Sequence, residues 1–220
     1  MLSKPLFRDR THAGEELAKE ILLQMSWDGF QADQKMVVYG LPRGGVPVAV
    51  PIAQRLKSPL SVIVAKKITL PENPELALGA VTSDGQVLWS KRKPQNFNLQ
   101  QMMLQQAQTK AQQAWEQFAP SCPPVTAHGV LALVVDDGIA TGMTMAVASQ
   151  ALKLHQPLAI WICVPVAPME LISSIQQWCD RLIVLETPYP FFNVSRFYEQ
   201  FDQVETQTVL SYLQQQTWLQ

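Results

Sequence analysis

The chain has 220 residues, of which 47 % are hydrophobic, and its formal net charge is −1 at pH 7. This length and apolarity allow a full hydrophobic core without disulfide bonds. Its basic residues form no block or stripe, which argues against a nucleic-acid groove or an anionic membrane surface and favours a small-molecule partner.

The three cysteines, Cys122, Cys163 and Cys179, are odd in number and lack CxxC spacing. We therefore expect free thiols in a reducing compartment. No apolar run approaches the ~20 residues of a membrane helix, and the first residues lack a signal-peptide core. A soluble cytoplasmic protein is the expectation.

Apolar segments alternate with amphipathic segments along the chain. Such alternation is typical of α/β proteins in which helices cover both faces of a parallel sheet. We expect residues 1–220 to form a single domain of this class. The predicted strands lie near Val37–Leu41, Ser61–Ala65, Val130–Val135, Ile160–Val166 and Leu182–Leu185, and the predicted helices near Glu15–Met25, Pro47–Leu56, Met143–Leu154 and Met169–Cys179.

The first strand runs into an anion-binding pattern. The segment VVYGLPRGGVPV, residues 37–48, passes from a strand through Pro-Arg-Gly-Gly to a helix that starts near Pro47, a residue suited to a first helical turn. Backbone N–H groups at such a junction bind anions. Arg43, Gly44 and Gly45 are therefore candidate ligands, and the alternative is a Gly-rich turn with an exposed arginine.

Two lysines, Lys66 and Lys67, follow the strand Ser61–Ala65. Beyond them, Leu70–Pro74 and the Ser83-Asp84-Gly85 turn fit a loop and a β-hairpin that could close over a site as a lid. The alternative is that the lysines only solvate the end of the strand.

An insertion rich in glutamine, residues 99–118, separates this lid from the next strand. Leu99, Met103, Ala107, Ala114 and Phe118 recur at helical spacing. We therefore predict an amphipathic helix that serves packing or a dimer contact, in preference to catalysis.

The segment VLALVVDDGIATGMT, residues 130–144, is the most informative part of the chain. Asp136 and Asp137 come at the carboxyl end of a buried strand, where open α/β sheets bind ligands, and can accept hydrogen bonds from two sugar hydroxyls or face a hydrated divalent cation. The small residues and hydroxyls that follow, just before a helix, form a phosphate-binding pattern. These candidates are Gly138, Ile139, Ala140, Thr141, Gly142, Met143 and Thr144. The alternative is a simple turn after a strand.

Two common nucleotide-binding motifs are missing from the sequence. Met143 stands where a P-loop needs its lysine, and no GxGxxG occurs. ATP and NAD are therefore disfavoured as ligands.

The segment 186–201 carries aromatic residues after the last predicted strand. Phe191 or Phe192 could stack on a planar base. The alternative is that these rings fill a core.

The pattern VVDDGIATGMT resembles the loop of the type I phosphoribosyltransferases that binds phosphoribosyl pyrophosphate (PRPP). Beyond this loop, most of the chain is similar to a family of bacterial phosphoribosyltransferases that are themselves assigned by resemblance. The matching segments are Phe7–Gly14, Leu41–Ala49, Lys66–Val81, Val135–Thr144 and Glu186–Phe201.

The resemblance implies transfer of ribose 5-phosphate from PRPP to a nitrogenous base, with Mg²⁺ held through substrate and water near Asp136 and Asp137, and a homodimer. It assigns the ribose hydroxyls to the acid pair, the 5′-phosphate to residues 139–144, and pyrophosphate to the Arg43 loop, often through a strained or cis peptide. Lys66 and Lys67 would precede the mobile lid, and one of them would act with the acid pair in catalysis by assisting the departing pyrophosphate. Segment 186–201 would form a hood over the base.

One departure from the resemblance concerns proton transfer. Ala140 stands where purine-salvage enzymes often have an Asp that accepts a proton from the base, and an alanine cannot do so. The alanine argues against that one mechanism and not against catalysis. Because a ligand pocket does not guarantee turnover, two alternatives stay open beside the transferase: a PRPP-binding regulatory protein without turnover, and a magnesium phosphohydrolase that uses the Asp pair.

Overall fold

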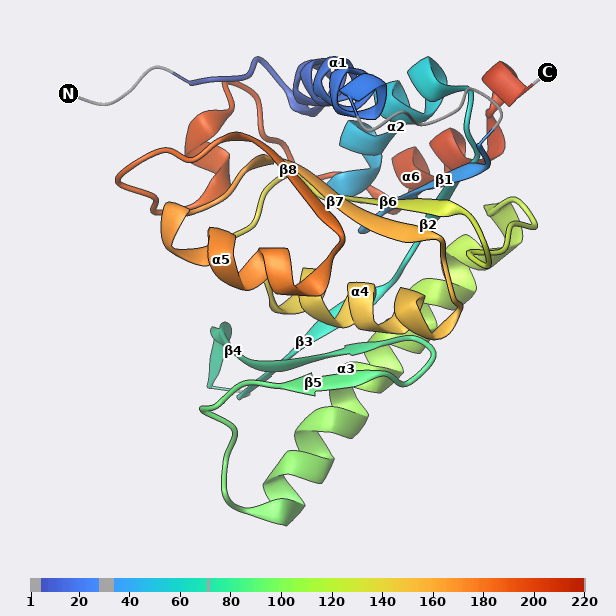
Figure 1. Ribbon diagram of the computed structural model, residues 1–220. Coiled ribbons are helices and arrows are strands. Elements are labelled where there is room, and N and C mark those ends of the chain that lie inside the picture. The colour runs from blue at the N-terminus through green and yellow to red at the C-terminus, as the bar shows by residue number, and fades with distance from the viewer. Residues whose placement is uncertain (1–4, 28–33, 71, 220) are drawn as a thin grey trace.

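The computed structural model describes residues 5–27, 34–70 and 72–219, and its main sheet has five parallel strands (Figure 1). Each of these strands pairs in parallel with its neighbour, and Gly40 lies level with Val135 at the carboxyl ends. The spatial order is β2 (Leu60–Val62), β1 (Met36–Gly40), β6 (Leu131–Val135), β7 (Ala159–Val166) and β8 (Arg181–Glu186).

Helices cover both faces of this sheet. α1 (Arg10–Trp27), α2 (Gly45–Leu56) and α6 (Thr206–Gln214) lie on one side, and α4 (Met143–Leu154) and α5 (Ile172–Ile175) on the other (Figure 1). Because successive strand residues point to opposite faces, Leu133 packs in the core under α1 and α2 while Val134 packs in the core under α4. The expected α/β class is confirmed.

A second sheet is antiparallel and will be called the lid sheet: β3 (Ala65–Leu70), β4 (Asn73–Thr82) and β5 (Val87–Trp89). The amphipathic helix predicted over residues 99–118 is present as α3 (Phe97–Phe118). Its Met103 and Ala107 pack against Ile68 and Val81 of the lid sheet, and farther along it Ala111 and Phe118 join the core of the main sheet. α3 therefore ties the lid sheet to the main sheet.

Several boundaries differ from the prediction. The strand expected over Ser61–Ala65 ends at Val62, and Ala65 already belongs to the lid sheet. The loop expected over Leu70–Pro74 is shorter than predicted, because Leu70 ends β3 and Asn73 already begins β4 opposite it; residue 71, between them, lies outside the described residues. Hydrophobic periodicity did not reveal the change of sheet because the apolar run continues through it.

The helix expected over Met169–Cys179 is broken into short pieces, and α6 was not expected. Among the described residues, 3₁₀ segments lie at Ala119–Ser121, Met169–Leu171, Gln176–Trp178, Val194–Phe197 and Thr217–Leu219. Within the described ranges, none of the helices has both the length and the apolarity to cross a bilayer.

The N-terminal segment pairs with the C-terminal hood segment, residues 186–201. The backbone N–H of Phe7 donates to the carbonyl of Phe197, and that of Glu199 donates to the carbonyl of Phe7, both at 2.9 Å. Phe7, Phe197 and Tyr198 are buried together in a small cluster. Residues nearly 200 positions apart in sequence therefore lie side by side.

Candidate functional site

The acid pair lies directly after β6 and touches the loop between β1 and α2. A Cβ atom on Gly44 would overlap Oδ2 of Asp137, and one on Gly45 would stand 2.5 Å from the carbonyl oxygen of Val135. No side chain fits at either position, so glycine is required by this approach. The structure thus brings the two predicted loops, Arg43-Gly44-Gly45 and Asp136-Asp137, into contact.

The two carboxyl groups are electrostatically unfavourable neighbours. Burial raises the pKa of Asp136 well above its usual range, and the adjacent charge of Asp137 raises it further. Burial also raises the pKa of Asp137, while the Arg10 guanidinium opposes this rise. Oδ1 of Asp136 accepts a hydrogen bond from the backbone N–H of Asp137 at 2.9 Å. The pair is therefore poised to gain from hydroxyl donors or a cation.

Arg10 holds Asp137 in place and was missed in the sequence analysis. Its Nε donates to Oδ2 of Asp137 at 2.8 Å, its Nη1 donates to the carbonyl of Asp202 at 2.8 Å, and its guanidinium carbon lies 3.7 Å from the ring centroid of Phe201. Arg10 is the first residue of α1, where the helix dipole disfavours a cation. That unfavourable placement was the one local sign of a specific partner.

A second support comes from the hood segment. The hydroxyl of Tyr198 donates to the carbonyl oxygen of Asp137 at 2.6 Å. The Tyr198 ring lies 5.5 Å from that of Phe7 and 4.9 Å from that of Phe201. Asp137 is thereby fixed from both ends of the chain.

A cavity of about 150 Å³ opens beside Asp136 at the N-terminus of α4. Gly142 precedes the helix with φ of 75°, and among the described residues no side chain caps its first N–H groups. Uncapped N–H groups and the positive end of the helix dipole attract an anion. The cavity is lined by Lys67, Asp136, Gly138, Ile139, Ala140, Thr141, Gly142, Thr144 and Met145.

Some residues of the loop 138–144 have no free backbone N–H group at the cavity. The N–H of Ile139 donates to the carbonyl of Val166 at 2.9 Å, and its side chain is buried. Ile139 therefore anchors the loop, although it was predicted as a ligand through its backbone. Met143 begins α4 and does not line the cavity. Gly138 leaves no room for a side chain because Val194 of the hood segment packs on it.

Lys66 and Lys67 lie within β3, not beyond the end of a parallel strand as predicted. Successive strand residues point to opposite faces, and the two lysines have different surroundings. Lys67 lines the cavity beside Asp136. Burial lowers the pKa of Lys66, and the charges of Arg43 and of Lys110 on α3 lower it further.

The Arg43 loop makes a tight turn between β1 and α2. The Pro42–Arg43 peptide is cis, and the N–H of Gly45 donates to the carbonyl of Leu41 at 2.9 Å. Nη1 of Arg43 lies 3.9 Å from Oε2 of the exposed Glu205. An ion pair this long and solvated is weak, so Arg43 can exchange it for a ligand.

The two aromatic candidates differ in exposure. Phe191 packs against Phe197 with ring centroids 5.1 Å apart, so it belongs to the core of the hood. Phe192 is 65 % exposed, and the guanidinium carbon of Arg196 lies 4.8 Å from its ring centroid. A role in base stacking stays a prediction, and Phe192 has the more accessible face.

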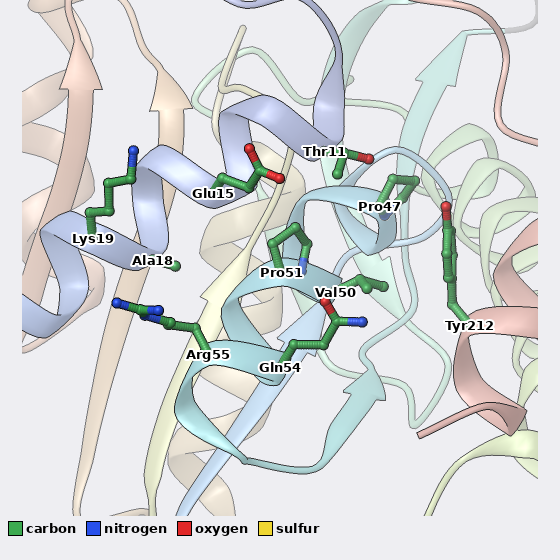
Figure 2. Close-up of a pocket in the computed structure, with 10 residues that line it drawn as sticks. All are labelled: Thr11, Glu15, Ala18, Lys19, Pro47, Val50, Pro51, Gln54, Arg55 and Tyr212. Carbon is green, nitrogen blue, oxygen red and sulfur yellow. The ribbon is translucent and has the colours of Figure 1, made fainter. Parts of the chain in front are cut away.

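A larger groove of about 680 Å³ lies between α1, α2 and α6 and shares no lining residue with the acid-pair cavity (Figure 2). Buried Ala18, Val50 and Pro51 lie within it, and Lys19 and Arg55 lie at the left of the view, with the Lys19 ammonium pointing away from the Arg55 guanidinium (Figure 2). None of the predicted site residues lines this groove.

The parallel sheet, with an acid pair and an uncapped helix at the carboxyl end of β6, defines the class: the chain has the fold of the type I phosphoribosyltransferases. The profile of the phosphoribosyl transferase domain matches residues 9–200, and the chain belongs to that family.

Curated relatives support this assignment. Over 212 residues the chain is 34 % identical to a protein of Mycobacterium tuberculosis H37Rv that is provisionally named a phosphoribosyl transferase; the match covers 94 % of this chain and 46 % of that protein. Its counterpart in strain CDC 1551 gives the same values. The chain therefore spans about half the length of the curated relatives it matches.

The crystal structure of TT1426 from Thermus thermophilus matches with a TM-score of 0.77 at 31 % identity. This match covers 94 % of this chain and 97 % of that one.

Proposed function

We propose that the protein transfers the 5-phosphoribosyl group from PRPP to a ring nitrogen of a base, with release of pyrophosphate. The observation that carries the proposal is the contact between three groups: the acid pair, the Arg43 loop that touches it, and the anion cavity at α4 beside Lys67. A phosphate, a pair of ribose hydroxyls and a pyrophosphate need three such neighbouring sites.

Each part of PRPP has a matching group. The N-terminus of α4 with Thr141 and Thr144 suits the 5′-phosphate. Asp136 and Asp137 suit the ribose hydroxyls, because a carboxylate accepts two such hydrogen bonds. The Arg43 loop and Lys67 suit the pyrophosphate.

The metal that this reaction implies is Mg²⁺. Over the described part of the chain, no three acidic, histidine or cysteine side chains cluster as metal ligands. Asp136 at the cavity fits a contact with a hydrated ion that substrate oxygens also hold. When bound, Mg²⁺ neutralises charge on the pyrophosphate.

In the reaction, the C1–oxygen bond to pyrophosphate breaks and its electron pair leaves with the pyrophosphate. A bond forms from the base nitrogen to C1, and the proton of that nitrogen is lost. The acid pair fixes the ribose while its ring becomes cationic. Ala140 cannot accept the proton, so we expect the base to lose it to water or to another group.

The test is release of pyrophosphate from PRPP and Mg²⁺ with a panel of purine and pyrimidine bases, with mass spectrometry of the nucleotide product. Lys67→Ala should lower kcat far more than it raises the Kd for PRPP, since only interactions that strengthen in the transition state raise kcat. Lys91→Ala, at an exposed position, is the matched control.

The second candidate is a regulatory protein that binds PRPP without turnover, because the same binding groups would serve a sensor as well as an enzyme. Tight PRPP binding with no pyrophosphate release for any base would support this regulator and overturn the transferase. Release of inorganic phosphate that needs no base would instead indicate a phosphohydrolase.

A further inference from the structure

Tyr39 is a buried side chain for which the proposed reaction has no use. It lies in β1, is only 7 % exposed, and burial raises the pKa of its hydroxyl to about 12. Among the described residues the hydroxyl has no hydrogen-bond partner. Unlike the Ser149 hydroxyl, which is fully buried and also lacks a partner, the Tyr39 hydroxyl is partly accessible. A buried phenol normally finds a partner. The Tyr39 hydroxyl is thus available to a molecule that enters beside it.

That space is a cavity of about 410 Å³, which we call the lid-hinge cavity. Its volume falls within the range typical of small-molecule sites. It is lined by Tyr39, Val62, Ile63, Val64, Ser83, Asp84, Trp115, Val125, Thr126, Ala127, Ala151, Leu152 and His155.

The lid-hinge cavity is separate from the acid-pair cavity. Thr144 lines the acid-pair cavity near the start of α4, whereas His155 follows the end of that helix. At 1.5 Å per residue these two positions are about 16 Å apart along the axis. The two cavities share no lining residue.

The chemistry of the walls selects the ligand. Apolar side chains and the indole of Trp115 offer flat, apolar contact, and the hydroxyls of Tyr39 and Thr126 offer hydrogen bonds. Asp84 accepts a hydrogen bond from Thr82 and can accept further donors. The lining residues, all of them described, include no lysine or arginine, and Asp84 is an anion, so a phosphate group would lack a strong cationic partner and would be repelled by that carboxylate.

We propose that the lid-hinge cavity binds an uncharged planar nitrogen heterocycle, a free base or its nucleoside, and that this ligand restrains the lid sheet. The position of the cavity supports the second half of the proposal. Val62–Val64 connect the main sheet to β3, which carries Lys66 and Lys67, and Ser83 and Asp84 lie in the turn from β4 to β5. A ligand held between them and α4 joins the lid sheet to the body of the protein.

The test is a titration of the full chain, without PRPP, with adenine, hypoxanthine, cytosine, uracil and their nucleosides. Tyr39→Phe keeps the ring and removes one hydrogen bond, so it should raise the Kd about three- to tenfold. Trp115→Ala should raise it by a similar factor through lost stacking, and Trp115→Phe replaces it if the alanine variant is unstable. Hydrogen exchange of β3–β5 amides should slow when the ligand is bound.

Matched controls distinguish this cavity from other sites. Tyr212→Phe changes a tyrosine of the groove between α1, α2 and α6 and should leave the Kd unchanged. Phe192→Ala in the hood segment should also leave the Kd unchanged. Adenosine should bind in preference to AMP, and the difference between base and nucleoside identifies the source of the heterocycle.

Several outcomes would overturn the proposal: no saturable binding of any compound, a Kd unaffected by Tyr39→Phe and both Trp115 variants, or a loss of binding with Tyr212→Phe or Phe192→Ala instead. Unchanged exchange in the lid sheet would remove the restraint on the lid. Because the Tyr39 and Trp115 variants report on the lid-hinge cavity and Phe192→Ala reports on the hood, binding at the lid-hinge cavity can be distinguished from base binding at a transferase site.

Discussion

Replacing Arg10 by methionine should expose how strongly the acid pair depends on one ion pair. Arg10 and Asp137 are only 12 % and 15 % exposed, with Nε and Oδ2 2.8 Å apart. Removing one partner of a buried pair costs about 3–5 kcal/mol because the other charge stays buried. Methionine keeps apolar contact with Phe201, and the Arg10 and Asp137 side chains are slightly exposed to water. We therefore expect the free energy of unfolding to fall by about 3 kcal/mol at pH 7.5.

The loss should depend on pH in a defined direction. Burial raises the folded-state pKa of Asp137 and Arg10 opposes the rise, so the variant has a folded-state pKa still farther above the unfolded value. A group of this kind contributes stability that is complete below its unfolded pKa and is lost as pH rises through its folded pKa. The deficit of Arg10→Met should therefore be smallest near pH 4.5 and should grow toward pH 7.5.

Urea unfolding at pH 4.5, 6.0 and 7.5 measures this dependence. Adding Asp137→Asn to Arg10→Met should restore most of the lost stability at pH 7.5, because it removes the unpaired charge. Arg8→Met, at an exposed position two residues earlier, is the control and should change stability little. A deficit below about 1 kcal/mol at pH 7.5, equal at pH 4.5 and not relieved by Asp137→Asn, would refute the assigned role of Arg10.

Four further substitutions probe the site and the core. Thr141→Val should weaken the binding of ribose 5-phosphate and of PRPP alike, whereas Arg43→Ala should weaken the binding of PRPP only. Titration calorimetry measures both affinities. Equal losses for the two ligands with Arg43→Ala would mean that the two loops are misassigned. Asp136→Asn should raise the free energy of unfolding by about 1 kcal/mol or more at pH 7.5 and by less at pH 4.5, because the raised pKa of Asp136 makes its ionised form costly in the folded protein. A variant less stable than wild type at pH 7.5 contradicts this argument. The same substitution should weaken PRPP binding roughly ten- to hundredfold. Ser149→Ala removes a buried hydroxyl without a hydrogen-bond partner. Urea unfolding should show stability that is unchanged or higher by up to about 1 kcal/mol. Ser211→Ala is the control, because the Ser211 hydroxyl donates to the carbonyl of Gln207, and its loss should not stabilise the protein.

The sequence alone determined the local order of elements at the site. An apolar run, two acids, a Gly/Thr loop and a helical pattern predict the strand, turn and helix that the structure has at β6 and α4. The Arg43 loop was predicted in the same way between β1 and α2. These predictions succeeded because each pattern depends on residues close in sequence, whose periodicity reports which side is buried.

Only the tertiary structure decided which distant residues complete the site. Arg10 precedes Asp137 by 127 positions, and Tyr198 reaches the same aspartate from the opposite end of the chain. Likewise, the division of Lys66 and Lys67 between two environments follows from β3 pairing with β4 in a second sheet, and the unbroken apolar run before the lysines contains no sign of that change. Periodicity records whether a position is buried but not what it is buried against, because that partner is selected by the packing of segments far apart in the chain.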